Sequence, residues 1–267
     1  MKYFESSTPP PTTNFLQSWG RFVIGRVRGL GIGLCLTFEA LIFFYRLPKR
    51  RPEFGRQLMN AGVKCFFVVS IVAFFTGMIL ALQTGLALKD WSKEDMVGNI
   101  VVQTMCREMG PFMTALILAA AIGSAFAAEI GTMKVSEEVA ALELMSINPV
   151  EYLVTPRLFA LLIMCPVLTI YTDILGTLGG MVVSQTQLDV YYKVYTRMAV
   201  DSLGNKEIYV GLFKSLIFGI VISTVSCYRG FATTNGAVGV GEAARKTVVT
   251  SFLYILILGY FITRIFY

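Results

Sequence analysis

The chain is 267 residues long, with 55% hydrophobic and only 15% charged residues. A soluble domain carries about 25% charged residues, so this composition excludes a mostly water-exposed protein. The net charge of +6 does not indicate nucleic-acid binding, because no basic patch alternates with exposed stacking aromatic residues. The sequence therefore predicts an all-α integral membrane protein.

The N-terminal region differs in kind from the rest. Residues 1–14 contain the Pro- and Thr-rich stretch STPPPTTN and are predicted to be a disordered tail. No signal peptide is expected, because the first long apolar run comes too late. Residues 15–50 alternate basic residues with an apolar face, and the apolar part, Leu30 to Tyr45, is only 16 residues long. That length favours an amphipathic helix along the membrane surface over a sixth span.

Five longer apolar runs predict membrane-spanning helices, because only internally hydrogen-bonded segments of about 20 residues cross hydrocarbon. Five spans place the two ends of the chain on opposite sides of the membrane. Most Lys and Arg residues then fall on the N-terminal side, so the positive-inside rule predicts a cytoplasmic N-terminus. The spans, within a single domain of residues 15–267, are expected at about 62–88, 105–128, 157–184, 208–228 and 246–265.

The sequence shows no sign of catalysis or of a metal site. The five cysteines are scattered singly, and there is no histidine, which removes the usual general base. Asp173 is the only aspartate within a predicted span, so the acid pair of an intramembrane aspartyl protease is missing. No Walker-type phosphate loop is present either. We therefore expect neither a catalytic residue nor a metal or cofactor bound by this chain.

The loop between the second and third predicted spans is unusually acidic. Ser136 is predicted to cap a helix of about 136–148, which Pro149 ends. Acidic residues in its first turn suit the helix dipole, and apolar residues at i, i+3 and i+6 form one face. That face is either solvated or docked on another protein, and the lack of an obvious cover within the chain favours docking. The residues expected to make this contact are Glu137, Glu138, Val139, Leu142 and Met145.

About fifty residues in the centre of the chain are similar to a known family. The stretch REMGPFMTALILAAAIGSAFAAEIGTMKVSEEVAALELMSINPVEYLVTPRLFA resembles the core of the MlaE permease family, the membrane subunits of ABC transporters that work with MCE proteins. FTGMILALQTG resembles the family's first-span signature, and GEAARKTVV the segment that opens its last span. The likeness extends over roughly residues 15–267. Two positions depart from the family pattern. Ala121 stands where the family often has Arg, which leaves Glu129 without an obvious partner. Glu138 stands where the family often has Gln.

This resemblance implies a fold and a function. The fold would be a surface-lying N-terminal helix and five spans, with a cytoplasmic coupling helix between the second and third. Members work as a symmetric pair in the inner membrane and move glycerophospholipid between the inner and outer membranes. A cytoplasmic ATPase binds the ATP, and an MCE-domain protein forms a ring on the periplasmic side. The chain would then be a transport subunit and no enzyme, with a periplasmic C-terminus.

The residues alone leave two other functions open. A stand-alone secondary transporter or channel needs intramembrane charges paired along a path, or inverted repeats. A chain with five spans cannot divide into two equal halves, and its spans are nearly free of charge. A membrane scaffold without cargo is compatible with the composition.

Arg107 and Glu108 are the residues most closely tied to the implied cargo. They are predicted to lie near the periplasmic end of the second span. Neighbouring helical residues point about 100° apart, so at least one should face the interior, where Arg matches a phosphate and Glu an ammonium group. We expect this pair to hold a phospholipid headgroup, in preference to snorkelling to the interface or forming an ion pair that holds the helix end. Gly110 and Pro111 are expected to break the regular helix geometry beside it. The predicted lining of the acyl-chain cavity is Gly77, Met78, Leu80, Ala81, Leu82, Gln83, Phe112, Ala115 and Leu116.

Overall fold

The computed structural model describes residues 15–43, 45, 51–91 and 93–267, with the backbone alone for residues 15–23, 25–28, 30 and 51. The predicted disordered tail, 1–14, lies outside the described residues. Within these ranges every regular element is a helix, as the composition predicts.

Five helices are long and apolar enough to cross a membrane, which confirms the predicted number. Each observed helix contains the predicted span and extends beyond it at both ends, because polar residues at the ends continue the backbone hydrogen bonds of the helix. The five helices are Pro52–Lys89, Glu94–Val135, Val150–Gln187, Asn205–Phe231 and Gly236–Phe266.

Several of these spans are built from consecutive helical segments. The first span belongs to α2 (Arg51–Lys89). The second joins η2 (Glu94–Met96), α3 (Val97–Thr104), η3 (Met105–Met109), α4 (Gly110–Leu118), η4 (Ala119–Gly123) and α5 (Ser124–Val135). The third joins η5 (Val150–Val154) and α7 (Thr155–Gln187), and the last two are α9 (Asn205–Phe231) and α10 (Gly236–Phe266). Outside the spans lie α1 (Phe15–Ile42), α6 (Glu138–Leu144) and α8 (Tyr192–Ser202).

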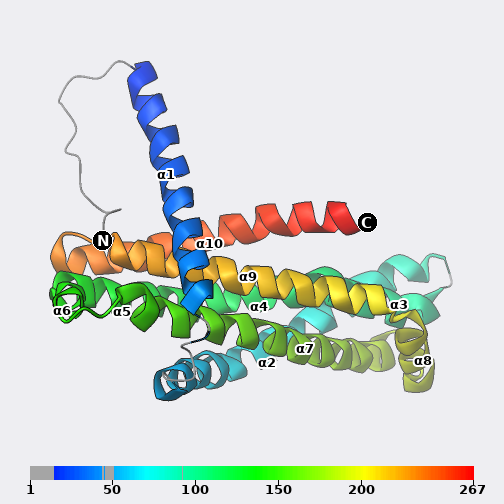
Figure 1. Cartoon of the computed structure of the whole chain (residues 1–267). Coiled ribbons are helices and arrows are strands. Elements are labelled where there is room, and N and C mark those ends of the chain that lie inside the picture. The colour runs from blue at the N-terminus through cyan, green and yellow to red at the C-terminus, as the bar shows by residue number, and fades with distance from the viewer. Residues whose placement is uncertain (1–14, 44, 46–50, 92) are drawn as a thin grey trace.

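The spans form one elongated bundle (Figure 1). One end, called the α6 end below, holds α6, the last turns of α9 and the start of α10. The other, the α8 end, holds α3 and α8, and the last turns of α10 point toward it. α7 packs against both α2 and α9, whereas α10 packs against α5 and α9. α2 and α10 are the least buried spans, so their outer faces are open to lipid or to other subunits.

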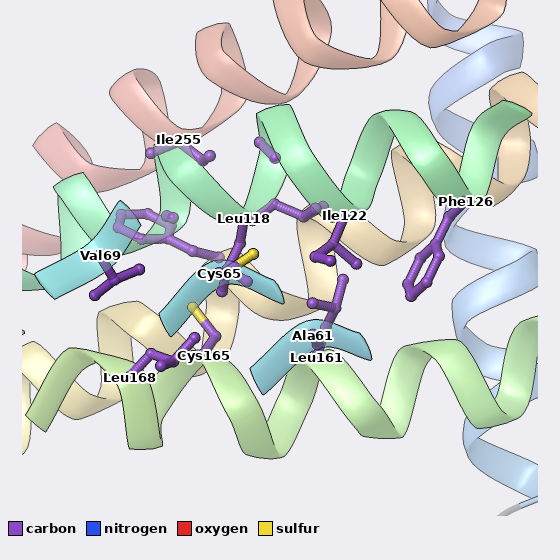
Figure 2. Packing of buried hydrophobic residues seen from close by; sticks show 14 residues of the cluster. Ala61, Cys65, Val69, Leu118, Ile122, Phe126, Leu161, Cys165, Leu168 and Ile255 are labelled. Carbon is purple, nitrogen blue, oxygen red and sulfur yellow. The ribbon is translucent and has the colours of Figure 1, made fainter. Parts of the chain in front are cut away.

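A cluster of buried apolar side chains joins all five spans. Figure 2 shows Cys65 of α2 and Cys165 of α7 close to Leu118 of the second span, with Ile255 of α10 nearby. Small residues let the helices approach closely, as is usual in membranes. α2 and α7 provide the tightest example: a side chain on Gly77 would collide with the carbonyl oxygen of Gly176.

α1 crosses the axis of the bundle at a steep angle (Figure 1). It contacts α9, where the Thr37 and Thr224 hydroxyls are 2.6 Å apart. It also contacts the segment after α6, where the Asn148 amide donates to Glu39 Oε1 at 2.9 Å. Glu39, the charge that interrupts the apolar part of this helix, therefore has a partner inside the protein. The location of α1 along the membrane surface stays a prediction.

Candidate functional site

A π-helical turn in the second span contains Arg107 and Glu108. In η3 the Gly110 N–H donates to the Met105 carbonyl five residues back, and Pro111 has no N–H to offer the Arg107 carbonyl. The ammonium group of Lys214, from α9, donates to that carbonyl at 2.8 Å. The regular α-helical geometry is thus interrupted next to Gly110 and Pro111, as expected, but the helix continues, and a side chain from another span replaces the lost donor.

The second helix is longer than the predicted span. It begins at Glu94, thirteen residues before Arg107, and its 42 residues exceed the roughly 20 that cross a bilayer. Arg107 and Glu108 contact Tyr267 and Thr263 of the last turn of α10, so the pair lies level with the end of another span. Its location near the periplasmic end of the second span stays a prediction.

Glu108 is held by residues from two other spans. Lys214 Nζ lies 2.7 Å from Glu108 Oε1 and 2.7 Å from the Thr263 hydroxyl of α10, which lies 2.8 Å from the same carboxylate oxygen. The Lys214 side chain is 1% exposed and that of Glu108 is 40% exposed. The charge of Glu108 is therefore balanced within the chain, and contact of its carboxylate with the ammonium of a headgroup stays a prediction.

Arg107 has a different environment from its neighbour. Its guanidinium carbon lies 3.6 Å from the centre of the Tyr267 ring, and the Lys206 ammonium lies 4.5 Å from the same centre. Among the described residues, no hydrogen bond or ion pair uses the guanidinium of Arg107. We call Arg107, Glu108, Lys214, Thr263 and Tyr267 together the Arg107 cluster.

Asp173 of α7 adds a second polar feature close to η3. Its Oδ1 is buried and has no hydrogen-bond partner in the described part of the chain. A side chain on Gly110 would collide with this oxygen. The Thr114 and Thr172 hydroxyls, 2.9 Å apart, connect the same two helices. Gly110 is therefore needed for close packing of the second span on α7.

A buried tyrosine helps to fix α8 to the end of the bundle. Tyr195 is fully buried among Val97, Val101 and Val183, and its hydroxyl donates to the Thr177 carbonyl at 3.1 Å. Burial raises the pKa of this hydroxyl above its ordinary value. The hydroxyl is therefore a stable donor, and it ties α8 to α7.

The residues predicted to line an acyl-chain cavity lie mostly in packed regions. Ala81 is buried beside Tyr195, with Met78, Leu80 and Leu82 packed around that cluster, and Gly77 abuts α7. Ala115 is buried in the cluster of Figure 2, and Phe112 packs against it. Gln83 is exposed and Leu116 partly buried. For Gly77, Ala81 and Ala115 the structure gives a packing role, and lipid contact by the set stays a prediction.

The acidic loop forms a shorter helix than expected. α6 ends at Leu144, before Pro149, and begins after Glu137, whose φ of 62° is left-handed. The Ser136 hydroxyl does not cap it; it donates to Glu138 at 2.9 Å and lies 3.0 Å from the Thr132 carbonyl. The predicted cap and helix length are therefore wrong.

The apolar face of α6 is also covered by the chain itself. Val139 and Leu142 are buried with Ile130, Leu153 and Phe231, so the expectation that nothing in the chain covers them is wrong. The exposed apolar residues are instead Leu144, 88% exposed, and Met145. Glu137 and Glu138, at the start of the same helix, are exposed as well.

Glu129 has a partner, contrary to expectation. Arg157 Nη2 lies 2.9 Å from Glu129 Oε2, and Nη1 of the same side chain donates to the Leu153 carbonyl at 2.8 Å. Arg157 is 4% exposed. The family arginine missing at Ala121 is therefore not required for Glu129 to form an ion pair.

Similar proteins identify the family. Residues 54–265 match the family described as Permease MlaE. The chain belongs to the MlaE permease family. A probable ABC transporter permease protein of Rickettsia prowazekii (strain Madrid E) is 37% identical over 248 residues, 93% of this chain and 96% of the relative. The intermembrane phospholipid transport system permease protein MlaE of Haemophilus influenzae is 31% identical over 255 residues, 95% and 98% of the two chains.

A plant protein is also similar. The protein TRIGALACTOSYLDIACYLGLYCEROL 1, chloroplastic, of Arabidopsis thaliana is 32% identical over 212 residues, 79% of this chain and 61% of the relative.

The match to the MlaE permease family covers α6, the Glu129–Arg157 pair and all of the Arg107 cluster except Tyr267. α1 and Tyr267 lie outside it. The cluster brings together three spans, and its members Lys214, Thr263 and Tyr267 were not singled out from the sequence as site residues. A lone Lys in a span was the available signal, since such a charge requires a partner.

Proposed function

We propose that this chain is the permease subunit of an ABC transporter that moves glycerophospholipids between the inner and outer membranes. Membership of the MlaE permease family supports the transport class, and the intermembrane phospholipid transport named for the Haemophilus influenzae relative supports the cargo. The observation that supports a lipid site most directly is Arg107. It is a cation of a membrane-spanning helix, beside the last turn of α10, and its N–H groups are not used by the described residues.

Arg107 binds the phosphate of the headgroup in this proposal. A planar guanidinium offers paired N–H donors that match two phosphate oxygens, and the contact gains strength where water is excluded. Lys214 is not the principal ligand, because Glu108, Thr263 and the Arg107 carbonyl already accept its three protons. Glu108 and Lys214 thus fix the turn that presents Arg107.

Arg107→Ala is expected to weaken binding of a fluorescent glycerophospholipid to the detergent-solubilised protein. A charge-assisted contact contributes roughly 1.5–3 kcal/mol, or about ten- to a hundredfold in affinity. The matched control is Arg264→Ala, which removes an exposed cation of α10 whose one described hydrogen bond, to Tyr260, is 3.4 Å long. Equal affinities of the two variants would show that Arg107 is only an interfacial anchor.

The partners in this proposal are assigned to the two ends of the bundle. A cytoplasmic ATPase binds at the α6 end, and a periplasmic MCE-domain protein sits at the α8 end, with two copies of the permease forming a homodimer. The N-terminus then lies in the cytoplasm and Tyr267 on the periplasmic side of the inner membrane. The exposed Leu144 and Met145 at the end of α6, and the exposed Glu137 and Glu138 at its start, support a docking role for the α6 end.

Leu144→Ser combined with Met145→Ser is expected to reduce the amount of ATPase that co-purifies with the permease, because both side chains are exposed and apolar. Reversing Glu137 and Glu138 to Lys should have the same effect through repulsion of basic residues on the ATPase. Val200→Ser, an exposed apolar residue of α8, is the control at the opposite end. Unchanged co-purification and an unchanged ATPase rate in both sets of variants would contradict the coupling role and the orientation built on it.

A further inference from the structure

Tyr267 lies directly against the cation that the proposed function assigns to the headgroup. Its N–H donates to the Thr263 carbonyl at 2.9 Å, so it continues the last turn of α10. Its ring centre is 3.6 Å from the Arg107 guanidinium carbon. The two residues are 160 positions apart, so the contact forms only when α10 is packed beside the second span.

The geometry of this contact leaves the donors of Arg107 available. The face of a guanidinium stacks on an aromatic ring through cation–π attraction, whereas its N–H groups point outward in the guanidinium plane. Among the described residues, no hydrogen bond uses those groups of Arg107. Arg157 differs in this respect, since its two terminal nitrogens donate to the Leu153 carbonyl and to Glu129. Arg107 is thus held by its face, with its edge free.

The same turn of α10 also fixes the neighbouring residue. Thr263 lies four positions before Tyr267 and therefore on the same side of the helix. Thr263 contacts Glu108 and Lys214, while Tyr267 contacts Arg107. One turn of α10 therefore sets the positions of both adjacent charges of η3.

We propose that Tyr267 is a positioning residue, which holds the Arg107 guanidinium flat so that its N–H edge meets the phosphate of a phospholipid headgroup. This inference rests on the proposed function of Arg107. An arginine without such a surface samples many rotamers, and binding must then order it. Stacking on the aromatic ring orders the Arg107 side chain in the free protein, so lipid binding does not have to supply the free energy of ordering it.

The test compares three variants by binding of the fluorescent glycerophospholipid to the full-length, detergent-solubilised permease. Tyr267→Leu should weaken the affinity by about threefold to tenfold, the range expected for one cation–π contact. Tyr267→Phe keeps the ring, so this variant should bind the lipid with the same affinity as the unsubstituted protein. Tyr260→Leu removes an exposed aromatic residue of the same helix that contacts Phe261 and should have no effect.

A double-variant cycle separates this inference from the proposed function. If Tyr267 acts through Arg107, Tyr267→Leu should have no further effect once Arg107 is Ala. An equal loss in both backgrounds, or a failure of Tyr267→Phe to restore binding, would overturn the positioning role while leaving Arg107 as the phosphate ligand. If Arg107→Ala alone leaves the affinity unchanged, the proposed headgroup site itself fails. A melting temperature measured for each variant shows that the fold is retained.

Discussion

Glu108→Ala, with Lys214 retained, is expected to destabilise the folded protein by about 3 kcal/mol, the lower end for the loss of one member of a buried ion pair, because the Glu108 side chain is itself 40% exposed. Lys214 is 1% exposed, so its ammonium would remain inside the bundle without a counter-charge. The Arg107 carbonyl and the Thr263 hydroxyl would be its only described partners. Reversible unfolding in mixed micelles measures the change.

The opposite variant should be milder. Lys214→Met leaves Glu108, whose side chain is 40% exposed and can be hydrated. Lys214→Met combined with Glu108→Ala removes both charges and should be more stable than Glu108→Ala alone, because no buried charge is left without a partner. Additive losses in the double variant would show that the two side chains are not coupled. Since Glu108→Ala acts on stability, Arg107→Ala is the cleaner probe of headgroup binding.

The number of spans was predictable because it depends on length and hydropathy alone. Each span needs about 20 apolar residues to cross hydrocarbon, and five such runs are separated by charged loops. The ends were not predictable in this way, since polar residues such as Glu94 continue a helix without contributing to the apolar run. The start of the second helix at Glu94 was missed for this reason.

Most of the wrong predictions concern contacts between residues that are far apart in the sequence and meet only in the folded bundle. The periodicity of α6 correctly grouped Val139 with Leu142 but could not show that Phe231, far along the chain, covers them. Likewise, nothing local connects Glu129 to Arg157, because the packing of α5 near the start of α7 brings them together. Pattern reveals which residues share a face, whereas tertiary packing decides what that face meets.

Glu129→Ala is the second substitution with a large expected effect, about 3 kcal/mol, near the lower end for a broken buried ion pair. Arg157 would stay buried with the Leu153 carbonyl as its remaining described acceptor, and its Nε already lacks a partner among the described residues. The effect falls at the lower end because the Glu129 side chain is half-exposed, so water can enter beside Arg157. Unfolding in mixed micelles and the melting temperature both measure this loss.

The controls for this prediction test charge and location separately. Glu129→Gln keeps an oxygen acceptor for Arg157 but removes the charge. The free energy of unfolding should therefore fall less in this variant than in Glu129→Ala. Glu242→Ala breaks an ion pair with Lys246 in which both side chains are exposed, and screening by water should leave stability unchanged. Because Leu153 and Arg157 lie next to the cluster that covers α6, Glu129→Ala should also loosen α6 and reduce ATPase co-purification. A loss from Glu129→Ala no larger than that from Glu242→Ala would mean that Arg157 does not depend on Glu129, and that α6 is held by its apolar contacts alone.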